Sequence, residues 1–224
     1  MNQIILIVII IILLYLIFTG NININSPEEK DLTGKEINKE LGKEVDVMPN
    51  YENSKFKEIY LAGGCFWGIE AYFDKILGVE FAEAGYANGE TEDTSYKRIE
   101  STGHAETVKV IYNPEVVNLE SVLEYYFRVI DPTILNRQGN DVGTQYRTGI
   151  YYVDDKDKEI IENYIEKISS NYDSKIVTEV EPLKNYIIAE EYHQDYLDKN
   201  PNGYCHINLS DIPNRKPVSQ KKLQ

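Results

Sequence analysis

The pattern of hydrophobic and polar residues separates an apolar start and a polar stretch from the rest of the chain. Residues 4–18 form an unbroken apolar run with no Lys or Arg before it, which predicts a membrane anchor or signal segment over residues 1–20. No clear small-residue cleavage site follows the run, so we expect a retained membrane anchor with the globular part outside the cytoplasm. Residues 21–56 are charged and poor in aromatic side chains, which is typical of a polar linker.

The remaining pattern predicts one folded domain over residues 57–213, followed by a disordered tail at 214–224. The predicted strands cover residues 59–62, 79–86, 106–112, 149–153 and 175–180. The predicted helices cover residues 65–77, 122–130, 155–168 and 189–197. Strands and helices alternate through both hairpin-like and crossover-like connections, which indicates an α/β sandwich built on a mixed sheet.

Composition and charge narrow the possible partners. The chain of 224 residues has 23 basic and 37 acidic residues and a formal charge of −14, which argues against binding to nucleic acid or to an anionic membrane surface. Its two cysteines, Cys65 and Cys205, are too few for a disulfide framework or a zinc site with four thiolates, but they suffice for one redox pair. One sizeable core fits this length, so we expect a single monomeric domain with appendages.

The stretch from Gly63 to Gly68 is the first candidate for chemistry. It contains Cys65 and the only tryptophan, Trp67, and it joins a strand-like run to a helix-like one. Unpaired N–H groups and the helix dipole at such a turn favour an anion and can lower the pKa of a thiol. Cys65 is therefore a candidate nucleophile, although a buried and inert cysteine fits the position equally well.

A second candidate lies at the start of the strand predicted at 106–112. On an extended chain His104 and Glu106 point to the same face, and a carboxyl group buried there has its pKa raised by desolvation. Glu106 is then a proton donor near neutral pH, and a half-exposed carboxylate is the structural alternative. His104 fits the role of a structural hydrogen-bonding residue, or of a group beside the substrate, better than that of a catalytic base.

Polar loops supply the other candidates. Tyr146 and the loop residue Tyr96 offer phenol donors on apolar rings, and Asp141 lies in a glycine-containing polar segment whose side chains can converge. Cys205 follows a turn-rich stretch after the last predicted helix, and a mobile thiol there can condense with a sulfenic acid to form a disulfide. A stable structural disulfide or a bystander thiol is the alternative for Cys205.

With these segments, the chain resembles the peptide methionine sulfoxide reductases of the A type. The resemblance covers about residues 59–212 and rests on five motifs in family order. These are Gly64-Cys65-Phe66-Trp67-Gly68, Gly103-His104-Ala105-Glu106, Gln138-Gly139-Asn140-Asp141 with Gly143-Thr144-Gln145-Tyr146-Arg147, Glu191-Tyr192-His193-Gln194, and Asn200-Pro201 with Gly203-Tyr204-Cys205. The resemblance implies a two-layer sandwich with a ferredoxin-like core, a mixed central sheet flanked by helices, and a long C-terminal coil.

The resemblance also implies an activity. It is the reduction of the S epimer of methionine sulfoxide, free or within oxidised proteins, back to methionine, as protein repair after oxidative damage. Cys65 would attack the sulfur while Glu106 protonates the departing oxygen. Tyr96 and Tyr146 would hold that oxygen, and Asp141 would orient polar groups near them.

Substrate selection and recycling follow from the same resemblance. Phe66 and Trp67 would form an apolar cup for the S-methyl group. Cys205 would convert the sulfenic acid on Cys65 into a disulfide, which thioredoxin or a similar dithiol reduces. The chain lacks the second relay cysteine of some family members, and no metal or organic cofactor is expected.

Two other classes of function fit part of the pattern. A cysteine hydrolase or acyltransferase would use Cys65 with His104 or His193 as base and Asp141 as orienting group, and would transfer acyl groups without a reductant. A membrane-tethered binding module would instead hold Cys65 and Cys205 in a permanent disulfide.

Overall fold

A six-stranded sheet forms the centre of the fold in the computed structural model, which describes residues 55–216. The strands follow one another across the sheet as β7 (Glu179–Pro182), β6 (Thr148–Tyr152), β1 (Lys57–Gly63), β3 (Ala105–Tyr112), β2 (Val79–Ala87) and β8 (Tyr186–Ile188). Neighbouring strands are antiparallel except β6 and β7, which are parallel. The predicted mixed sheet is confirmed.

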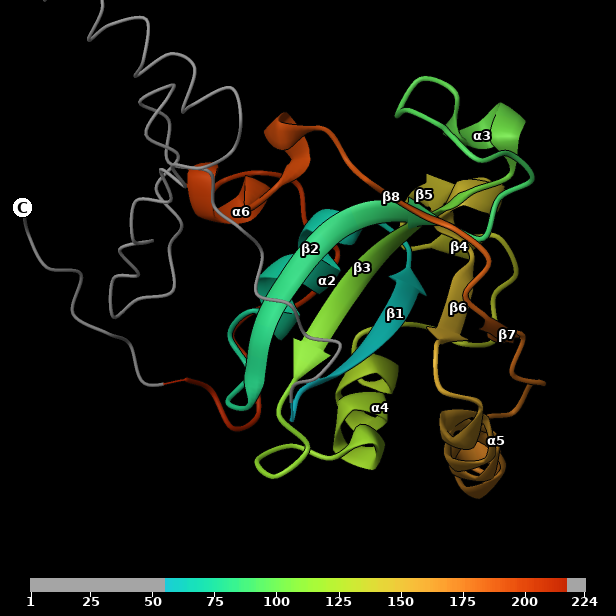
Figure 1. The fold of residues 1–224 in the computed structure, drawn as a ribbon, viewed down its shortest axis with the longest axis vertical. Helices are drawn as coiled ribbons and strands as arrows, with labels where there is room; N and C mark the ends of the chain where they lie inside the picture. Colours follow the sequence, from blue (N-terminus) through green and yellow to red (C-terminus); the bar gives the residue numbers. More distant parts are fainter. Residues whose placement is uncertain (1–54, 217–224) are drawn as a thin grey trace, which may run out of the picture. The chain divides into compact units, whose positions relative to one another are not determined.

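Helices connect the strands in the order of a ferredoxin-like core. The helices are α2 (Phe66–Phe73), α3 (Ile99–Thr102), α4 (Leu119–Phe127), α5 (Asp155–Ser169) and α6 (Tyr196–Lys199), with 3-10 turns η2 (Thr144–Tyr146) and η3 (Glu191–His193). A short hairpin, β4 (Arg137–Gln138) and β5 (Asp141–Val142), lies outside the main sheet. The run β1–α2–β2–β3–α4–β6, with strand order β6-β1-β3-β2, is the expected core, and after α5 the chain continues as a long coil with short elements (Figure 1).

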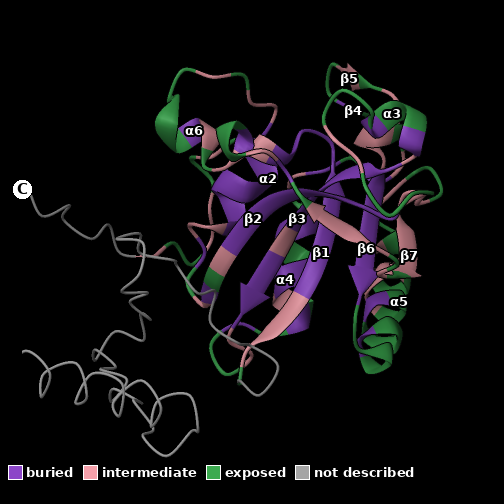
Figure 2. Cartoon of the chain, turned by 45° about the horizontal axis from the view of Figure 1, so that its top comes forward, coloured by how far each residue is buried: buried purple, intermediate pink, exposed green. Residues whose placement is uncertain are grey.

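Alternation along the strands assigns side chains to the two faces of the sheet. Ile59 and Leu61 of β1 pack into the main core with α2 and α4, whereas Tyr60 and Ala62 belong to a smaller cluster on the other face. Part of the C-terminal coil covers that second face, and Figure 2 shows that the central strands β1, β2, β3 and β6 are largely buried. The same alternation places the even-numbered positions of β3, among them Glu106, on the face that the helices cover.

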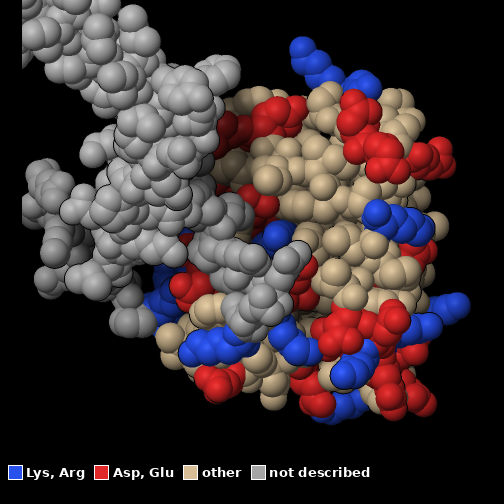
Figure 3. All heavy atoms as spheres, in the orientation of Figure 1, with Lys and Arg blue, Asp and Glu red and all other residues tan. Residues whose placement is uncertain are grey.

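Helix α5 exposes charged side chains of both signs. It buries only Asp157 and Ile161, and Figure 3 shows acidic and basic side chains intermixed on the side of the molecule where α5 lies. Asp157 is paired with Lys57 at 2.9 Å, so the amphipathic helix is tied to the first strand. This surface is solvated rather than shaped for a ligand.

The structure differs from the sequence prediction in the C-terminal part. The strand predicted at 175–180 is displaced to β7, because the Val177 N–H donates to the Pro132 carbonyl at 2.8 Å. That bond holds the preceding residues against a loop instead of the sheet. Strand β8, which the hydrophobic pattern did not predict, pairs with the end of β2.

The helix predicted at 189–197 is broken into η3 and α6. Asp195 adopts a left-handed conformation with φ 51°, which a continuous helix does not allow. The Gln194 side-chain amide accepts from the Ala84 N–H at 3.0 Å and donates to the Ala84 carbonyl at 2.9 Å. The segment therefore pairs with strand β2 through a side chain instead of completing a helical turn.

The described region begins two residues before the predicted domain and ends three residues after it. Residues 214–216, which the sequence assigned to the tail, pair with residues 75–77 between α2 and β2, and the Leu77 N–H donates to the Asn214 carbonyl at 2.8 Å. The predicted anchor and all but the last two residues of the predicted linker lie outside the described residues. Within residues 55–216, no helix is both long enough and apolar enough to cross a membrane.

Candidate active site

The turn between β1 and α2 presents Cys65 at the start of the helix. Cys65 is the N-cap residue of α2 and is 7% exposed. Gly64 before it has φ +79°, and a Cβ there would lie 2.5 Å from the Cβ of Gln138, so both the backbone and the packing require glycine. The Trp67 N–H donates to the Cys65 sulfur, and the thiol thus meets the helix end as the sequence predicted.

The pKa of the Cys65 thiol is nevertheless raised, contrary to the lowering expected from the sequence. Burial is the main cause, because a thiolate loses its hydration there, and the negative charge of an ionised Glu106 adds to the shift. The hydrogen bond from the backbone N–H of Trp67 lowers the pKa of the thiol, but by less than burial and Glu106 raise it. The free site therefore holds a protonated thiol whose ionisation depends on the charge of its neighbours.

Glu106 lies on the helix-covered side of β3, beside the helix of the nucleophile. Its Oε2 accepts a hydrogen bond from the Phe66 N–H at 3.0 Å. Burial raises the pKa of Glu106 to about 8, although the Phe66 N–H favours the charged form. This burial agrees with the neutral carboxylic acid that the sequence predicted, and near pH 7 a neutral Glu106 does not oppose ionisation of Cys65.

Two phenols reach this acid from separate segments. Tyr96 comes from the loop between β2 and α3, Tyr146 ends η2, and a hydrogen bond joins the two side chains. Together with Glu106 they line a cavity of about 210 Å³. Burial raises the pKa of both tyrosines, so both phenols stay protonated and can donate to an oxygen in the cavity.

An aromatic wall stands next to the nucleophile. Trp67 stacks on Tyr196 with ring centroids 3.7 Å apart, and its Nε1 donates to His193 Nδ1 at 3.1 Å. The His193 ring in turn lies 5.1 Å from Phe66 and 4.6 Å from Tyr96. Burial lowers the pKa of His193, so the neutral imidazole can accept the tryptophan bond. The C-terminal coil, which carries His193 and Tyr196, thus contacts both residues of the predicted cup, Phe66 and Trp67.

The second thiol lies on the coil that passes over α2. A Cβ on Gly68 would lie 3.1 Å from the Cys205 sulfur, so the missing side chain lets the coil approach the helix closely. Cys205 is half-buried, and its S–H donates to the Ile207 carbonyl at 3.3 Å. Both Cys65 and Cys205 are free thiols in this structure, and Cys205 adds a small part to the rise in the pKa of Cys65.

Asp141 borders the site from the β4–β5 hairpin. Its negative charge acts on Cys65 and Glu106, and it shares a hydrogen bond with the Tyr204 side chain. Its Oδ2 is buried without a hydrogen-bond partner among the described residues. One carboxylate oxygen is therefore able to accept from a group inside the site.

His104 lies apart from this group, and its contacts agree with the interpretation of His104 as a structural hydrogen-bonding residue. Its buried ring hydrogen-bonds to the Thr102 hydroxyl at 3.0 Å and packs so closely on Gly89 that a Cβ there would collide with it. Gly103 before it has φ 70° and ends α3. His104 therefore supports the base of the loop that carries Tyr96.

The hydrophobic pattern did not indicate Glu190, which fastens the same loop from the other side. Its carboxylate accepts from the Tyr86 hydroxyl at 2.6 Å and from the Tyr96 N–H at 3.1 Å. Tyr196 was missed as well. Both residues flank the Glu191–Gln194 motif in the sequence, and that position is the one feature of the sequence that could have indicated them.

Comparison with known proteins identifies the family. Residues 57–223 match the family model described as peptide methionine sulfoxide reductase. The chain belongs to the peptide methionine sulfoxide reductase family. Among solved structures, reduced Mxr1 from Saccharomyces cerevisiae is 42% identical over 74% of this chain and 94% of that one, with a TM-score of 0.66.

Two further structures resemble this peptide methionine sulfoxide reductase. Methionine sulfoxide reductase A of Corynebacterium diphtheriae is 36% identical over 69% of this chain and 79% of that one, with a TM-score of 0.62. Mxr1 from Saccharomyces cerevisiae in complex with Trx2 is 32% identical over 67% of this chain and 91% of that one, with a TM-score of 0.50. These matches agree with the A type that the motifs indicated.

The geometry suits a peptide methionine sulfoxide reductase better than a cysteine hydrolase. The imidazoles of His104 and His193, the two bases considered for acyl transfer, bond to the Thr102 hydroxyl and to Trp67 Nε1 instead of to the Cys65 sulfur. No group of three or more His, Cys, Asp and Glu side chains in the described part of the chain is arranged to hold a metal ion.

Proposed function

We propose that this peptide methionine sulfoxide reductase uses Cys65 as nucleophile and Glu106 as acid. The cysteine sulfur bonds to the sulfoxide sulfur, the sulfoxide oxygen takes a proton from Glu106, and the thiol proton restores the acid. Methionine then leaves and the oxygen remains on Cys65, so a thiol and a sulfoxide become a sulfenic acid and a thioether. Two electrons pass from the cysteine to the substrate sulfur.

One observation carries this proposal. The carboxyl group of Glu106 is buried, bonded to the backbone directly after Cys65, and protonated near neutral pH. Such a neutral acid can protonate a weakly basic oxygen inside an apolar site. The phenols of Tyr96 and Tyr146 open on the same cavity, where they donate to that oxygen as it gains charge, and Asp141 orients polar groups beside them.

The substrate methyl group would lie against Phe66 and Trp67. Sulfur and methyl contacts with aromatic rings contribute about 0.3 to 1.5 kcal/mol, and the stacking and hydrogen bond on Trp67 keep this wall in a fixed orientation. With the oxygen directed to the acid and the methyl group to the rings, only one epimer directs its sulfur to Cys65. The S epimer is the proposed substrate, free or within a peptide.

Cys205 would return the enzyme to its starting state. Its thiol attacks the sulfenic acid on Cys65, which forms a disulfide and releases water. The close approach of the Cys205 sulfur to Gly68 on α2 supports this role. The complex of Mxr1 with Trx2 supports a thioredoxin-like dithiol as the reductant of that disulfide.

We also propose that residues 4–18 tether the enzyme to a membrane with its domain outside the cytoplasm. The apolar run and the polar stretch after it support this proposal. Protease treatment of intact cells tests it, since an exposed domain is digested and a cytoplasmic one is protected. Recovery of the chain from the soluble fraction after cell lysis would contradict the tether.

The activity is tested with the purified full chain, dithiothreitol, and the separated S and R sulfoxides of a methionine-containing peptide. We expect repeated reduction of the S epimer with dithiol, and one methionine per chain without it. Cys65→Ser is the control and should form no methionine. Acyl transfer without reductant, or undiminished reduction by the control, would contradict the proposal.

A further inference from the structure

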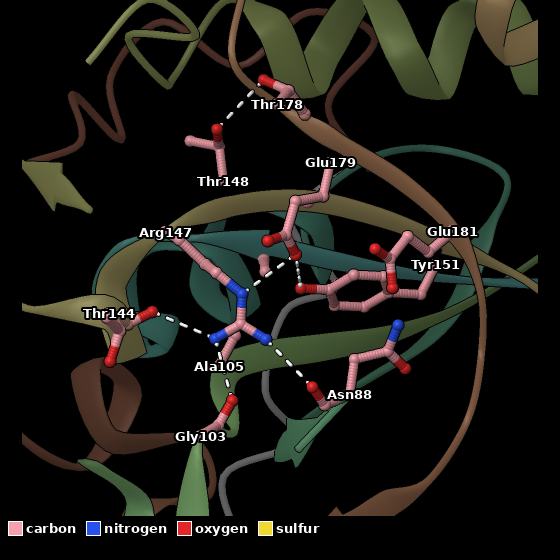
Figure 4. A network of polar contacts seen from close by, with 12 residues as sticks. Asn88, Gly103, Ala105, Thr144, Arg147, Thr148, Tyr151, Thr178, Glu179 and Glu181 are labelled. Atoms are coloured by element: carbon pink, nitrogen blue, oxygen red, sulfur yellow. Dashed lines mark hydrogen bonds and ion pairs between the residues drawn. The ribbon is translucent and has the colours of Figure 1, made fainter. Parts of the chain in front are cut away.

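Arg147 binds four oxygen atoms from four separate places in the fold. Its Nε donates to Glu179 Oε2 at 2.9 Å. Its two terminal nitrogens donate at 3.1 Å to the backbone carbonyls of Gly103, Thr144 and Asn88. Figure 4 shows these oxygens gathered around the guanidinium group, and only 11% of the arginine side chain is exposed. The cation is thus shielded from water and balanced by one carboxylate.

The three carbonyls belong to the segments that carry the active-site phenols. Asn88 and Gly103 are the two ends of the loop from which Tyr96 projects, and both have positive φ, 52° and 70°. Thr144 begins η2, the turn of the second phenol, which directly precedes Arg147 in the sequence. One guanidinium group therefore joins both ends of the first segment to the start of the second.

We propose that Arg147 is a positioning residue for sulfoxide reduction, because it sets the placement of Tyr96 relative to Tyr146 and so the point where both hold the substrate oxygen. The inference rests on the proposed function, since it assumes that the phenols bind this oxygen. Misplacement of a catalytic group by about 1 Å can slow a reaction about 100-fold. Arg147 therefore affects the rate strongly without touching the substrate.

Arginine suits this place better than any other cation. A guanidinium group has five N–H donors in fixed directions, whereas a lysine ammonium has three donors on one nitrogen. Arg147→Lys keeps the positive charge beside Glu179 but leaves at least one of the carbonyls without its donor. The loop also stays attached through Glu190, which accepts from the Tyr96 N–H. The variant should therefore fold with a shifted loop.

The test is a double-mutant cycle on the full chain, with the single-turnover rate of methionine formation as the measurement. Arg147→Lys is introduced into the natural sequence and into a chain that carries Tyr96→Phe and Tyr146→Phe. We expect it to slow reduction about 10- to 100-fold in the natural sequence, but less than about 3-fold where the hydroxyls are absent. Equal slowing in both backgrounds would overturn the proposal, because a purely structural role does not depend on the hydroxyls.

Two further variants keep the result interpretable. Arg128→Lys is the matched control, since Arg128 is exposed and pairs with the surface carboxylates of Glu124 and Asp211, and its rate should equal that of the natural chain. Glu179→Gln leaves Arg147 in place but weakens its bond to the Glu179 side chain. This variant should slow reduction less than Arg147→Lys does, and the slowing should also disappear in the chain without the two hydroxyls. It therefore tests the proposal even if Arg147→Lys does not fold. Failure of the proposed function gives a different result: the natural chain makes no methionine, or loss of both hydroxyls leaves its rate unchanged.

Discussion

Replacing Glu106 by glutamine separates the catalytic role of this acid from its effect on the fold. Glutamine has nearly the same shape, and its side-chain carbonyl can still accept the hydrogen bond that the Phe66 N–H now donates to Oε2. It cannot deliver a proton to the sulfoxide oxygen. Because general acid catalysis contributes about 100- to 10,000-fold, we expect single-turnover reduction to slow by that factor in Glu106→Gln.

The same change should make the protein more stable. Glu106 has a pKa of about 8 in the fold against an ordinary value of 4.5, so between these pH values the folded state holds a proton that the unfolded state has lost. The free energy of unfolding therefore falls as pH rises through this range, by about 1.4 kcal/mol per pH unit, and levels off above it. At pH 8 the free energy of unfolding is therefore lower by about 3 to 5 kcal/mol than at low pH. Glutamine does not ionise, so Glu106→Gln avoids this decrease.

Urea denaturation of the reduced proteins between about pH 5 and pH 8.5 measures this difference. Glu106→Gln should exceed the natural chain in stability by an amount that grows with pH, while the reduction rate of the natural chain falls above about pH 8 as its acid ionises. Glu92→Gln, in an exposed loop, is the matched control and should change neither quantity. A Glu106→Gln protein that is no more stable at pH 8.5, or that reduces sulfoxide at the natural rate, would refute the reasoning.

Three other changes test recycling and the substrate cup. Cys205→Ser should release one methionine per chain and keep a sulfenic acid that a dimedone-type reagent traps; continued turnover with thioredoxin would contradict the resolving role. Gly68→Ala adds a methyl group 3.1 Å from the Cys205 sulfur and should slow disulfide formation, followed by mass spectrometry, without slowing methionine release; equal rates of disulfide formation would count against the approach across α2. Trp67→Phe loses the bond to His193, worth about 1 kcal/mol, and should raise KM for the sulfoxide about 5-fold in steady-state assays, whereas an unchanged KM would exclude Trp67 from substrate binding.

Local patterns were enough to predict the parts of the site that depend on neighbouring residues in the chain. The strand-to-helix turn at Cys65 and the inward face of Glu106 follow from periodicities of a few residues, and the structure has both. The raised pKa of Glu106 also follows from such a pattern, because strand alternation alone predicts its burial.

Other features depend on contacts that local patterns do not contain. The pKa of Cys65 is set by burial and by a carboxyl group on another strand, so a rule about helix ends predicts the wrong direction. His104 packs on Gly89 and bonds to Thr102 at the base of the Tyr96 loop, contacts that the spacing of His104 and Glu106 does not indicate. The coil that carries Tyr196 and Cys205 has little regular structure, and its path is fixed by side-chain contacts such as that of Gln194 with β2.

The way Arg147 closes the Tyr96 loop has a consequence for how such an enzyme can change. At the base of the loop the guanidinium group bonds to main-chain carbonyls of Asn88 and Gly103, which every amino acid possesses. Exposed residues between these ends can therefore be replaced without loss of the anchor points, whereas Gly89, which packs on His104, and Tyr96 itself must stay. Residues 90–93, which are exposed and precede Tyr96, are accordingly the natural place to build libraries that alter which sequences around an oxidised methionine are repaired, while Tyr96 and the other reacting groups are kept.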